Sequence, residues 1–198
     1  MNTTDKEQEK AELAARKKKI LLISVGSGVA TLAVGWLIWL AIFSSQFITF
    51  TENNYHIAIK YPRGWTVAPG YAGTVVTFVS PKEDGLDTFQ ENLNIAVMDL
   101  SQQPMTLEQY SELAIKQMNA VFKTNIEVVE SKPITYAGGP AYKYKVKAPN
   151  PDDLILTIIW FIRDNQAYTI TYIGQALFQE KYQPKFDEMV RSFSIPTL

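Results

Sequence analysis

Hydrophobic and polar positions divide this chain into three parts. Charged side chains recur through residues 1–19 and again after residue 51, but none occurs between Ile20 and Thr51. The apolar run Ile20–Phe43 exceeds the roughly 20 residues that a helix needs to cross a bilayer core. The pattern therefore predicts a charged tail at 1–19, a transmembrane helix at 20–43, a linker at 44–53 and a folded domain at 54–198.

Two other interpretations of the apolar run are weaker. A buried helix of a soluble protein is shorter and keeps a polar stripe. A cleaved signal peptide has a shorter apolar region followed by a small-x-small site, whereas Ile42 and Phe43 stand at the exit here. Arg16 and the lysines that follow it precede the run, and this asymmetry predicts a cytoplasmic N-terminus and an extracytoplasmic domain, which is periplasmic, extracellular or lumenal.

Alternation and turn signals in the C-terminal part predict several strands. Residues 55–61 alternate as a half-buried strand does and end at Pro62-Arg63-Gly64-Trp65, where Trp65 is expected at a core edge. Further strands are predicted at 74–80, 92–100, 127–130, 134–136, 141–147 and 167–173. The segment 154–162 is almost wholly apolar, which is typical of a strand covered on both faces.

Helical spacing predicts two helical regions. Thr106 and Gln109 form a capping-box pattern at the start of one helix. Its expected apolar face is Leu107, Tyr110, Leu113, Ala114, Met118, Val121 and Phe122, with Gln117 as a polar exception. Residues 175–193 are the second region, in which Pro184 is expected to kink the helix or to start another one. The predicted fold class is α+β, an antiparallel sheet of about five to seven strands flanked by helices and preceded by one transmembrane helix.

Composition narrows the possible chemistry. The chain has no cysteine, which excludes disulfides, thiolate metal sites and a lipidated cysteine anchor. After the apolar run, 13 Lys and Arg stand against 16 Asp and Glu, and this balance argues against nucleic-acid binding. His56 is the single histidine, so a two-histidine metal site cannot form. We expect no cofactor and no enzymatic activity.

Three groups of residues are candidate contact sites. Glu83, Asp84, Asp87 and Glu91 offer carboxylates for calcium but lack the spacing of a calcium-binding loop. Lys143, Lys145 and Lys147 share one face of a predicted strand and suit an acidic partner or anionic headgroups, although lysine also protects sheet edges. Ser24, Gly28, Thr31 and Gly35 share one side of the membrane helix and permit self-association or contact with a membrane complex.

The order of these signals resembles the PsbP-like family, which is named for an extrinsic protein of photosystem II. The motifs that carry the resemblance are Tyr55-x-Ile57-x-Ile59-x-Tyr61-Pro62-x-Gly64-Trp65, Thr77-Phe78, Asn94-Ile95, Leu107 with Tyr110, Gly139-Pro140-Ala141-Tyr142 and Ser192-Phe193. The resemblance implies an α-β-α sandwich and a non-enzymatic role in binding or assembly. The transmembrane anchor departs from photosynthetic members, which have transit peptides or a lipidated cysteine.

The sequence thus favours a membrane-anchored binding domain that docks on, assembles or stabilises a membrane protein complex. A photosystem-associated subunit on the lumenal side is one alternative. An extracytoplasmic solute-binding protein or enzyme is another, and it would require a pocket with converging polar groups. The lipid bilayer and a protein complex are the expected partners, with nucleic acid excluded.

The predicted topology can be tested by proteolysis. A protease added outside intact cells or vesicles should digest the domain while sparing the N-terminal tail, because the positive residues hold the tail inside. Immunoblotting with a tag at each end measures both outcomes. Digestion of the domain only after lysis would contradict the predicted topology.

Overall fold

The computed structural model describes Gly35 and residues 46–70, 73–85, 87, 89–122, 126–148 and 153–196. The predicted membrane helix, apart from Gly35, lies outside these residues. No helix within the described part of the chain is long and apolar enough to cross a membrane. The folded unit begins at Phe47.

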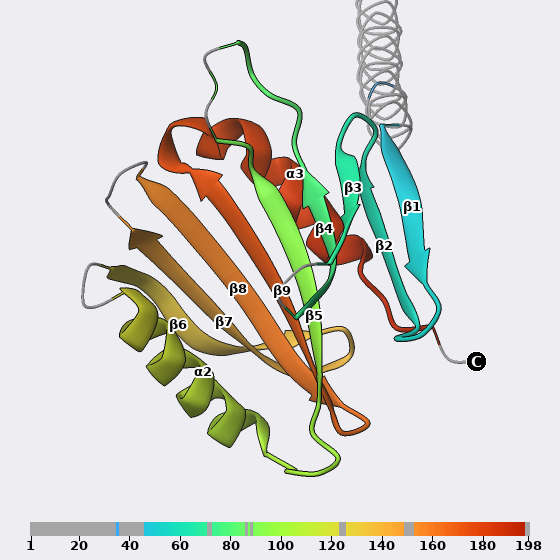
Figure 1. The fold of residues 1–198 in the computed structure, drawn as a ribbon, viewed down its shortest axis with the longest axis vertical. Helices are drawn as coiled ribbons and strands as arrows, with labels where there is room; N and C mark the ends of the chain where they lie inside the picture. The colour runs from blue at the N-terminus through green and yellow to red at the C-terminus, as the bar shows by residue number, and fades with distance from the viewer. Residues whose placement is uncertain are drawn as a thin grey trace, which may run out of the picture. The chain divides into compact units, whose positions relative to one another are not determined.

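The described residues form a seven-stranded antiparallel sheet in the order β3-β4-β5-β9-β8-β7-β6 (Figure 1). Its strands are β3 (Thr66–Pro69), β4 (Thr74–Val79), β5 (Asn92–Asp99), β6 (Glu127–Tyr136), β7 (Gly139–Ala148), β8 (Leu154–Arg163) and β9 (Gln166–Gln175). Tight turns join β6 to β7 and β8 to β9, and Asp164 and Asn165 adopt positive φ in the second of these turns. The predicted antiparallel α+β class is confirmed.

A second, two-stranded sheet lies beside the first and pairs β1 (Phe47–Glu52) with β2 (Ile57–Pro62). Residues 47–52 belong to the stretch that the sequence pattern placed in the linker, and the predicted strand at 55–61 begins only at Ile57. Phe50 explains why β1 folds onto the domain, since its ring meets Phe78 edge-on at 5.5 Å between centroids. Phe78 is fully buried.

The C-terminal segment is tied to β2. Ala58 and Ser194 exchange two backbone hydrogen bonds, at 3.0 Å and 2.8 Å between nitrogen and oxygen. The backbone nitrogen of Lys60 also donates to Oγ of Ser192 at 2.8 Å. Residues 192–194 therefore form hydrogen bonds with β2, near the N-terminal end of the domain.

Side-chain hydrogen bonds cap the start of the first helix, and a 3₁₀ turn precedes the second. α2 (Leu107–Phe122) starts with the predicted capping box, in which the Thr106 nitrogen donates to Gln109 Oε1 at 2.9 Å and the Gln109 nitrogen donates to Thr106 Oγ1 at 3.2 Å. The predicted C-terminal helical region is confirmed except at its ends, since Gln175 is the last residue of β9, and Pro184 lies inside one helix rather than starting another. A 3₁₀ turn, η1 (Ala176–Phe178), follows and leads into α3 (Gln179–Ser192), which contains Pro184.

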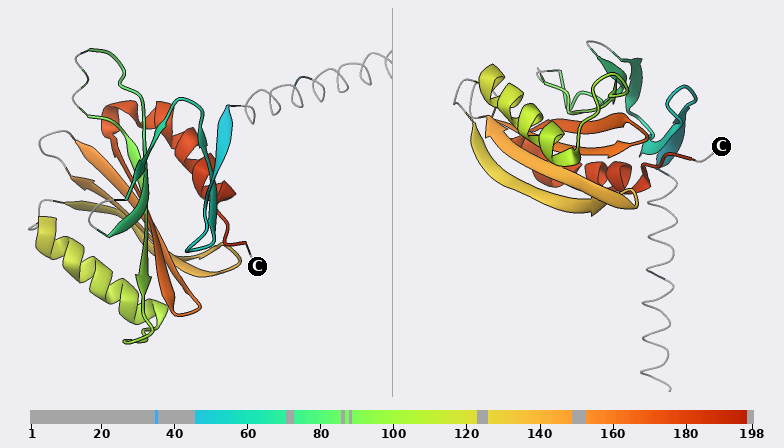
Figure 2. Two further views of the ribbon diagram at one scale, coloured as in Figure 1. Left: turned by 45° about the vertical axis from the view of Figure 1, so that its right-hand side comes forward. Right: turned by 90° about the horizontal axis from the view of Figure 1, so that it is seen from below.

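The two faces of the large sheet carry separate cores. Tyr182, Phe186 and Met189 of α3 pack with β2, β4, β5 and β9 on one face, and Trp65 caps that core edge-on to Tyr182 at 5.9 Å, as predicted. α2 packs on the other face over buried residues of β7 and β8. Figure 2 shows both helices against the strands. β8 is buried on both faces along most of its length, in agreement with its apolar sequence.

Removal of β1 should destabilise the domain. A fragment of residues 53–198 should unfold at a lower urea concentration than one of residues 46–198, because it loses the β1–β2 ladder and the contact of Phe50 with Phe78. Loss of a partly buried aromatic ring alone costs on the order of 2 kcal/mol. Phe50→Ala in the longer fragment should reproduce part of the loss, whereas Thr49→Ala, at an exposed position of the same strand, should not. Equal midpoints for both fragments would contradict the role of β1.

Candidate functional site: a groove between α2 and the sheet edge

The way α2 packs on the sheet creates the candidate site. Ser111 is the buried residue of α2, while the apolar side chains that face the sheet stay half-buried. The predicted apolar face was too broad, since Leu113 and Val121 are 38% and 73% exposed. Ile115, which was not predicted, packs against the sheet instead. The helix therefore rests on a narrow stripe and leaves space along its side.

A buried hydrogen-bond chain fixes the helix at this position. The indole nitrogen of Trp160 donates to Oγ of Ser111 at 2.7 Å, and the same hydroxyl donates to the backbone oxygen of Leu107 at 2.6 Å. Tyr142 stacks on Trp160 with ring centroids 5.3 Å apart and 13° between planes. The Tyr142 hydroxyl lies 2.9 Å from Ser131 Oγ on β6. This network sets the distance between α2 and the β6–β7 edge.

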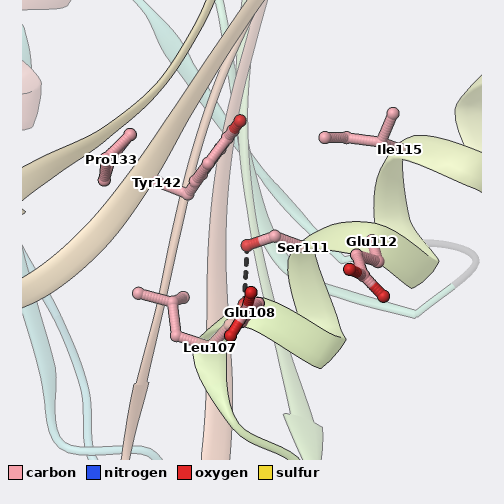
Figure 3. Close-up of a pocket in the computed structure, with 7 residues that line it drawn as sticks. All are labelled: Leu107, Glu108, Ser111, Glu112, Ile115, Pro133 and Tyr142. Atoms are coloured by element: carbon pink, nitrogen blue, oxygen red, sulfur yellow. Dashed lines mark hydrogen bonds between the residues drawn. The ribbon is translucent and has the colours of Figure 1, made fainter.

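The space between them is a groove of about 510 Å³. Its lining residues, drawn in Figure 3, are Leu107, Glu108, Ser111, Glu112, Ile115, Pro133 and Tyr142. Figure 3 shows that the helix supplies Leu107 and Ile115, while Pro133 and Tyr142 come from the strands. Glu108 and Glu112 are exposed and one helical turn apart, so they place two carboxylates on one side of α2.

This groove can hold an apolar side chain, with the two carboxylates available to a neighbouring cation. No lysine or arginine belongs to its described lining, and Lys132 beside Pro133 pairs with Glu130 at 2.7 Å. Sequence reasoning missed the groove because its walls come from residues far apart in the chain. The available signals were Ser111 within an apolar helical stripe and the four-residue spacing of Glu108 and Glu112.

The edge strand β6 supports groove binding better than addition of a further strand. Among the described residues β6 pairs with β7 alone, and Val128 and Val129 are exposed on it. A bulge between Val128 and Glu130 interrupts its register, and Pro133 lacks a backbone donor. Both features are typical protection of a sheet edge.

The predicted lysine face lies on the opposite side of the sheet from the groove. Tyr144 and Val146 are buried beneath α2, as the alternation predicted. Glu130 pairs with Lys143 at 2.8 Å, so its carboxylate offsets the positive charge at that point. Hydrogen bonds from Lys132 and Lys143 lower the pKa of Glu130. Lys147 lines a separate cavity of about 320 Å³ with Glu127 and Asp153, and Lys145 is half-buried.

The four calcium candidates do not converge. Glu83 bonds to Lys181 and Tyr182, and both oxygens of Asp87 accept backbone hydrogen bonds, from Glu83 at 2.8 Å and Phe89 at 3.0 Å. Glu91 is fully buried, and Asp84 makes an interaction of its own. Within the described residues, no three acidic or histidine side chains gather as metal ligands.

The remaining candidates lie elsewhere. Ser24, Gly28 and Thr31 are outside the described residues, and Gly35 is described as helical and exposed. His56 occupies the turn before β2 with φ of 52° and borders a cavity of about 470 Å³ with Arg163, Asp164, Gln166 and Tyr168. In that cavity the Tyr168 hydroxyl donates to Gln166 Oε1 at 2.7 Å, and Arg163 donates to the backbone oxygen of Ala137.

Comparison with known proteins gives the class of this fold. The PsbP family profile matches residues 45–195, and the chain belongs to the PsbP family. No protein with a curated description matches the sequence significantly.

Solved structures show the same fold at low identity. The cyanobacterial PsbP, CyanoP, from Synechocystis aligns with a TM-score of 0.58 at 15% identity, covering 76% of this chain and 93% of the other. The Ran-binding protein Mog1p of Saccharomyces cerevisiae aligns at 0.53 and 13%, covering 75% and 95%. LpqN of Mycobacterium tuberculosis, which is involved in cell envelope biogenesis, aligns at 0.50 and 8%, covering 77% and 91%.

A double-mutant cycle tests whether the bond between Ser111 and Trp160 positions α2. Ser111→Ala should lower the free energy of unfolding by about 1–3 kcal/mol, because it leaves a buried indole N–H without an acceptor. In a Trp160→Phe background, which has no such donor, the same substitution should cost much less. Urea unfolding followed by circular dichroism gives the four values of the cycle. Equal costs in both backgrounds would show that the bond does not position α2.

Proposed function

We propose that this protein is a membrane-anchored, non-enzymatic PsbP-type domain that holds a protein partner in the groove between α2 and the β6–β7 edge. The observation that carries the proposal is the groove itself, an apolar space rimmed by two carboxylates. The partner is a segment that presents an apolar side chain next to a lysine or arginine.

Several findings support a binding role. Family membership places the chain among domains that resemble each other in fold, and the structurally similar Mog1p is a Ran-binding protein. The groove walls are apolar and rigidly placed by the Trp160–Ser111 bond, so the bound side chain would lose water without a large rearrangement of the domain. The carboxylates of Glu108 and Glu112 would favour a cationic neighbour and disfavour an acidic one.

The predicted membrane helix would determine where the groove meets its partner. It would keep the domain close to the membrane on the extracytoplasmic side, which raises the effective concentration of the groove for partners in the same membrane. LpqN, a protein of the same fold, is involved in cell envelope biogenesis. We therefore propose a membrane protein complex as the partner, which this domain assembles or stabilises.

Photo-crosslinking from the groove tests the proposal. A photoreactive amino acid at Ile115 should crosslink one protein partner in intact cells, whereas the same group at Val121, exposed on the same helix, should not. Mass spectrometry of the product identifies the partner. Co-purification of chlorophyll-binding subunits would favour the photosystem-associated alternative instead.

A matched pair of charge variants tests the role of the rim. Glu108→Gln with Glu112→Gln should reduce the crosslinking yield from Ile115 several-fold, because two carboxylates that face the cation are lost. Gln117→Lys with Asn119→Lys changes the net charge equally on exposed positions of α2 and should leave the yield unchanged. Equal effects of both pairs, or equal crosslinking from Ile115 and Val121, would reject the groove as the docking site.

A further inference from the structure

Glu91 is a buried carboxyl group that the groove does not use. It precedes β5 and is 0% exposed. Its Oε2 accepts a hydrogen bond from the Ser80 hydroxyl at 3.2 Å, and its backbone oxygen accepts one from the Ser80 nitrogen at 2.8 Å. Oε1 is also buried and has no hydrogen-bond partner within normal geometry among the described residues, although the backbone N–H of Gln175 lies near the carboxyl group. A buried oxygen with no partner is costly, and more so when it carries charge.

Two further buried hydroxyl groups belong to the same face of the sheet, and that of Tyr172 lies beside Glu91. Tyr172 on β9 and Thr157 on β8 are register partners, so their side chains project to the same side. They are 2% and 1% exposed, and neither hydroxyl has a hydrogen-bond partner among the described residues. The interior therefore holds an unpaired carboxyl oxygen together with unpaired hydroxyls that can donate or accept.

Gly174 shows how closely Glu91 and Tyr172 approach each other. A Cβ atom at this position would lie 2.5 Å from the Tyr172 hydroxyl oxygen and 3.1 Å from Cγ of Glu91. Both groups thus border the same point above the Gly174 backbone. Glycine is required there because any side chain would displace one of them.

No cation in the described part of the chain contacts Glu91 directly, although Lys185 interacts with it at longer range and the charge of Glu91 acts to raise the pKa of that lysine. Glu83 is engaged by Lys181 and by the Tyr182 hydroxyl. Lys185 lies with Nζ 4.6 Å from the centroid of the Tyr182 ring, and burial lowers its pKa. Among the described residues, Glu91 makes no ion pair within 4 Å. Asp87 adds a negative charge nearby, which disfavours ionisation of Glu91 further.

We infer from this geometry that the folded domain contains a proton-binding site, in which Glu91 is held as the neutral carboxylic acid. Protonation turns one carboxyl oxygen into a donor. The neighbouring hydroxyl of Tyr172 accepts this hydrogen bond directly or through one bridging water. The site lies on the α3 side of the sheet and is independent of the groove proposed above.

This site makes stability depend on pH in a stated direction. Burial raises the pKa of Glu91 above its ordinary value of 4.5, and nearby backbone N–H groups and the Ser80 hydroxyl offset only part of that rise. The unfolded chain therefore loses this proton near pH 4.5, while the folded chain keeps it to higher pH. The contribution of Glu91 to stability is full below pH 4.5 and falls as the pH rises through the pKa of the folded state. Acidification thus favours the folded domain at this residue.

Glu91→Gln in the full chain is the main test, because glutamine resembles the neutral acid and does not titrate. The variant should unfold at a higher urea concentration than the wild type at neutral pH, and the difference should shrink toward zero below pH 4.5. Glu83→Gln is the matched control, for which the change in stability should have the opposite sign. Hydrogen bonds from Lys181 and Tyr182 lower the pKa of Glu83, so this variant should lose stability at neutral pH and approach the wild type in acid.

Infrared difference spectroscopy supplies a readout that does not depend on folding. The wild type at neutral pH should show the carbonyl stretch of a protonated carboxyl group that is absent from Glu91→Gln. Absence of this band, together with loss of stability in Glu91→Gln at neutral pH, would show that Glu91 is ionised, with Lys185 as its counter-charge, and would overturn the inference. A stability difference of the same size at every pH would overturn it as well.

Discussion

The antiparallel pairing of β5 with β9 is the interaction on which the rest of this structure depends. β5 is the last strand of the first half of the domain and β9 is the last strand of the second half. Eight register pairs from Asn92–Ile173 to Asp99–Gln166 join them. Because β9 occupies the position beside β5, the chain must leave β5, cross by way of α2 and enter the sheet at its far edge with β6. The strands that follow then bring it back to the centre. α2 is consequently placed over the β7–β8 region, and the groove forms where the helix meets the edge.

This topology separates two kinds of chemistry onto two faces of one sheet. The α2 face carries a narrow helix contact held by the Trp160–Ser111 bond, which leaves an open apolar groove beside it. The α3 face carries the larger aromatic core, including Tyr172 stacked on Phe186 at 4.8 Å between centroids. That core encloses Glu91 completely. The proposed partner surface and the proposed proton site therefore lie on opposite faces of the sheet.

The proposed anchor would also shape how these features act. A groove held near a membrane meets partners at a high effective concentration, so a modest affinity is sufficient for a stable complex. An interior carboxylic acid would respond to the pH of the compartment that holds the domain. The two proposals concern different parts of the domain. Failure of one would leave the other in place.

Much of the local structure could be predicted from the sequence alone. The capping box of Thr106 and Gln109, the alternation of Tyr144 and Val146 with lysines, and the doubly buried strand β8 depend on neighbouring residues, whose chemistry acts over a few positions. The opening family motif also lies in a short, continuous stretch of the chain.

The features that only the tertiary structure determined depend on contacts between residues far apart in the sequence. β1 is a strand because Phe50 meets Phe78, and Ile115 rather than Leu113 faces the sheet because of how α2 is placed. Glu91, a carboxylate that the sequence offered for calcium, is instead fully buried beside Gly174 of β9. Contacts between distant segments determine burial, and a linear pattern does not contain them.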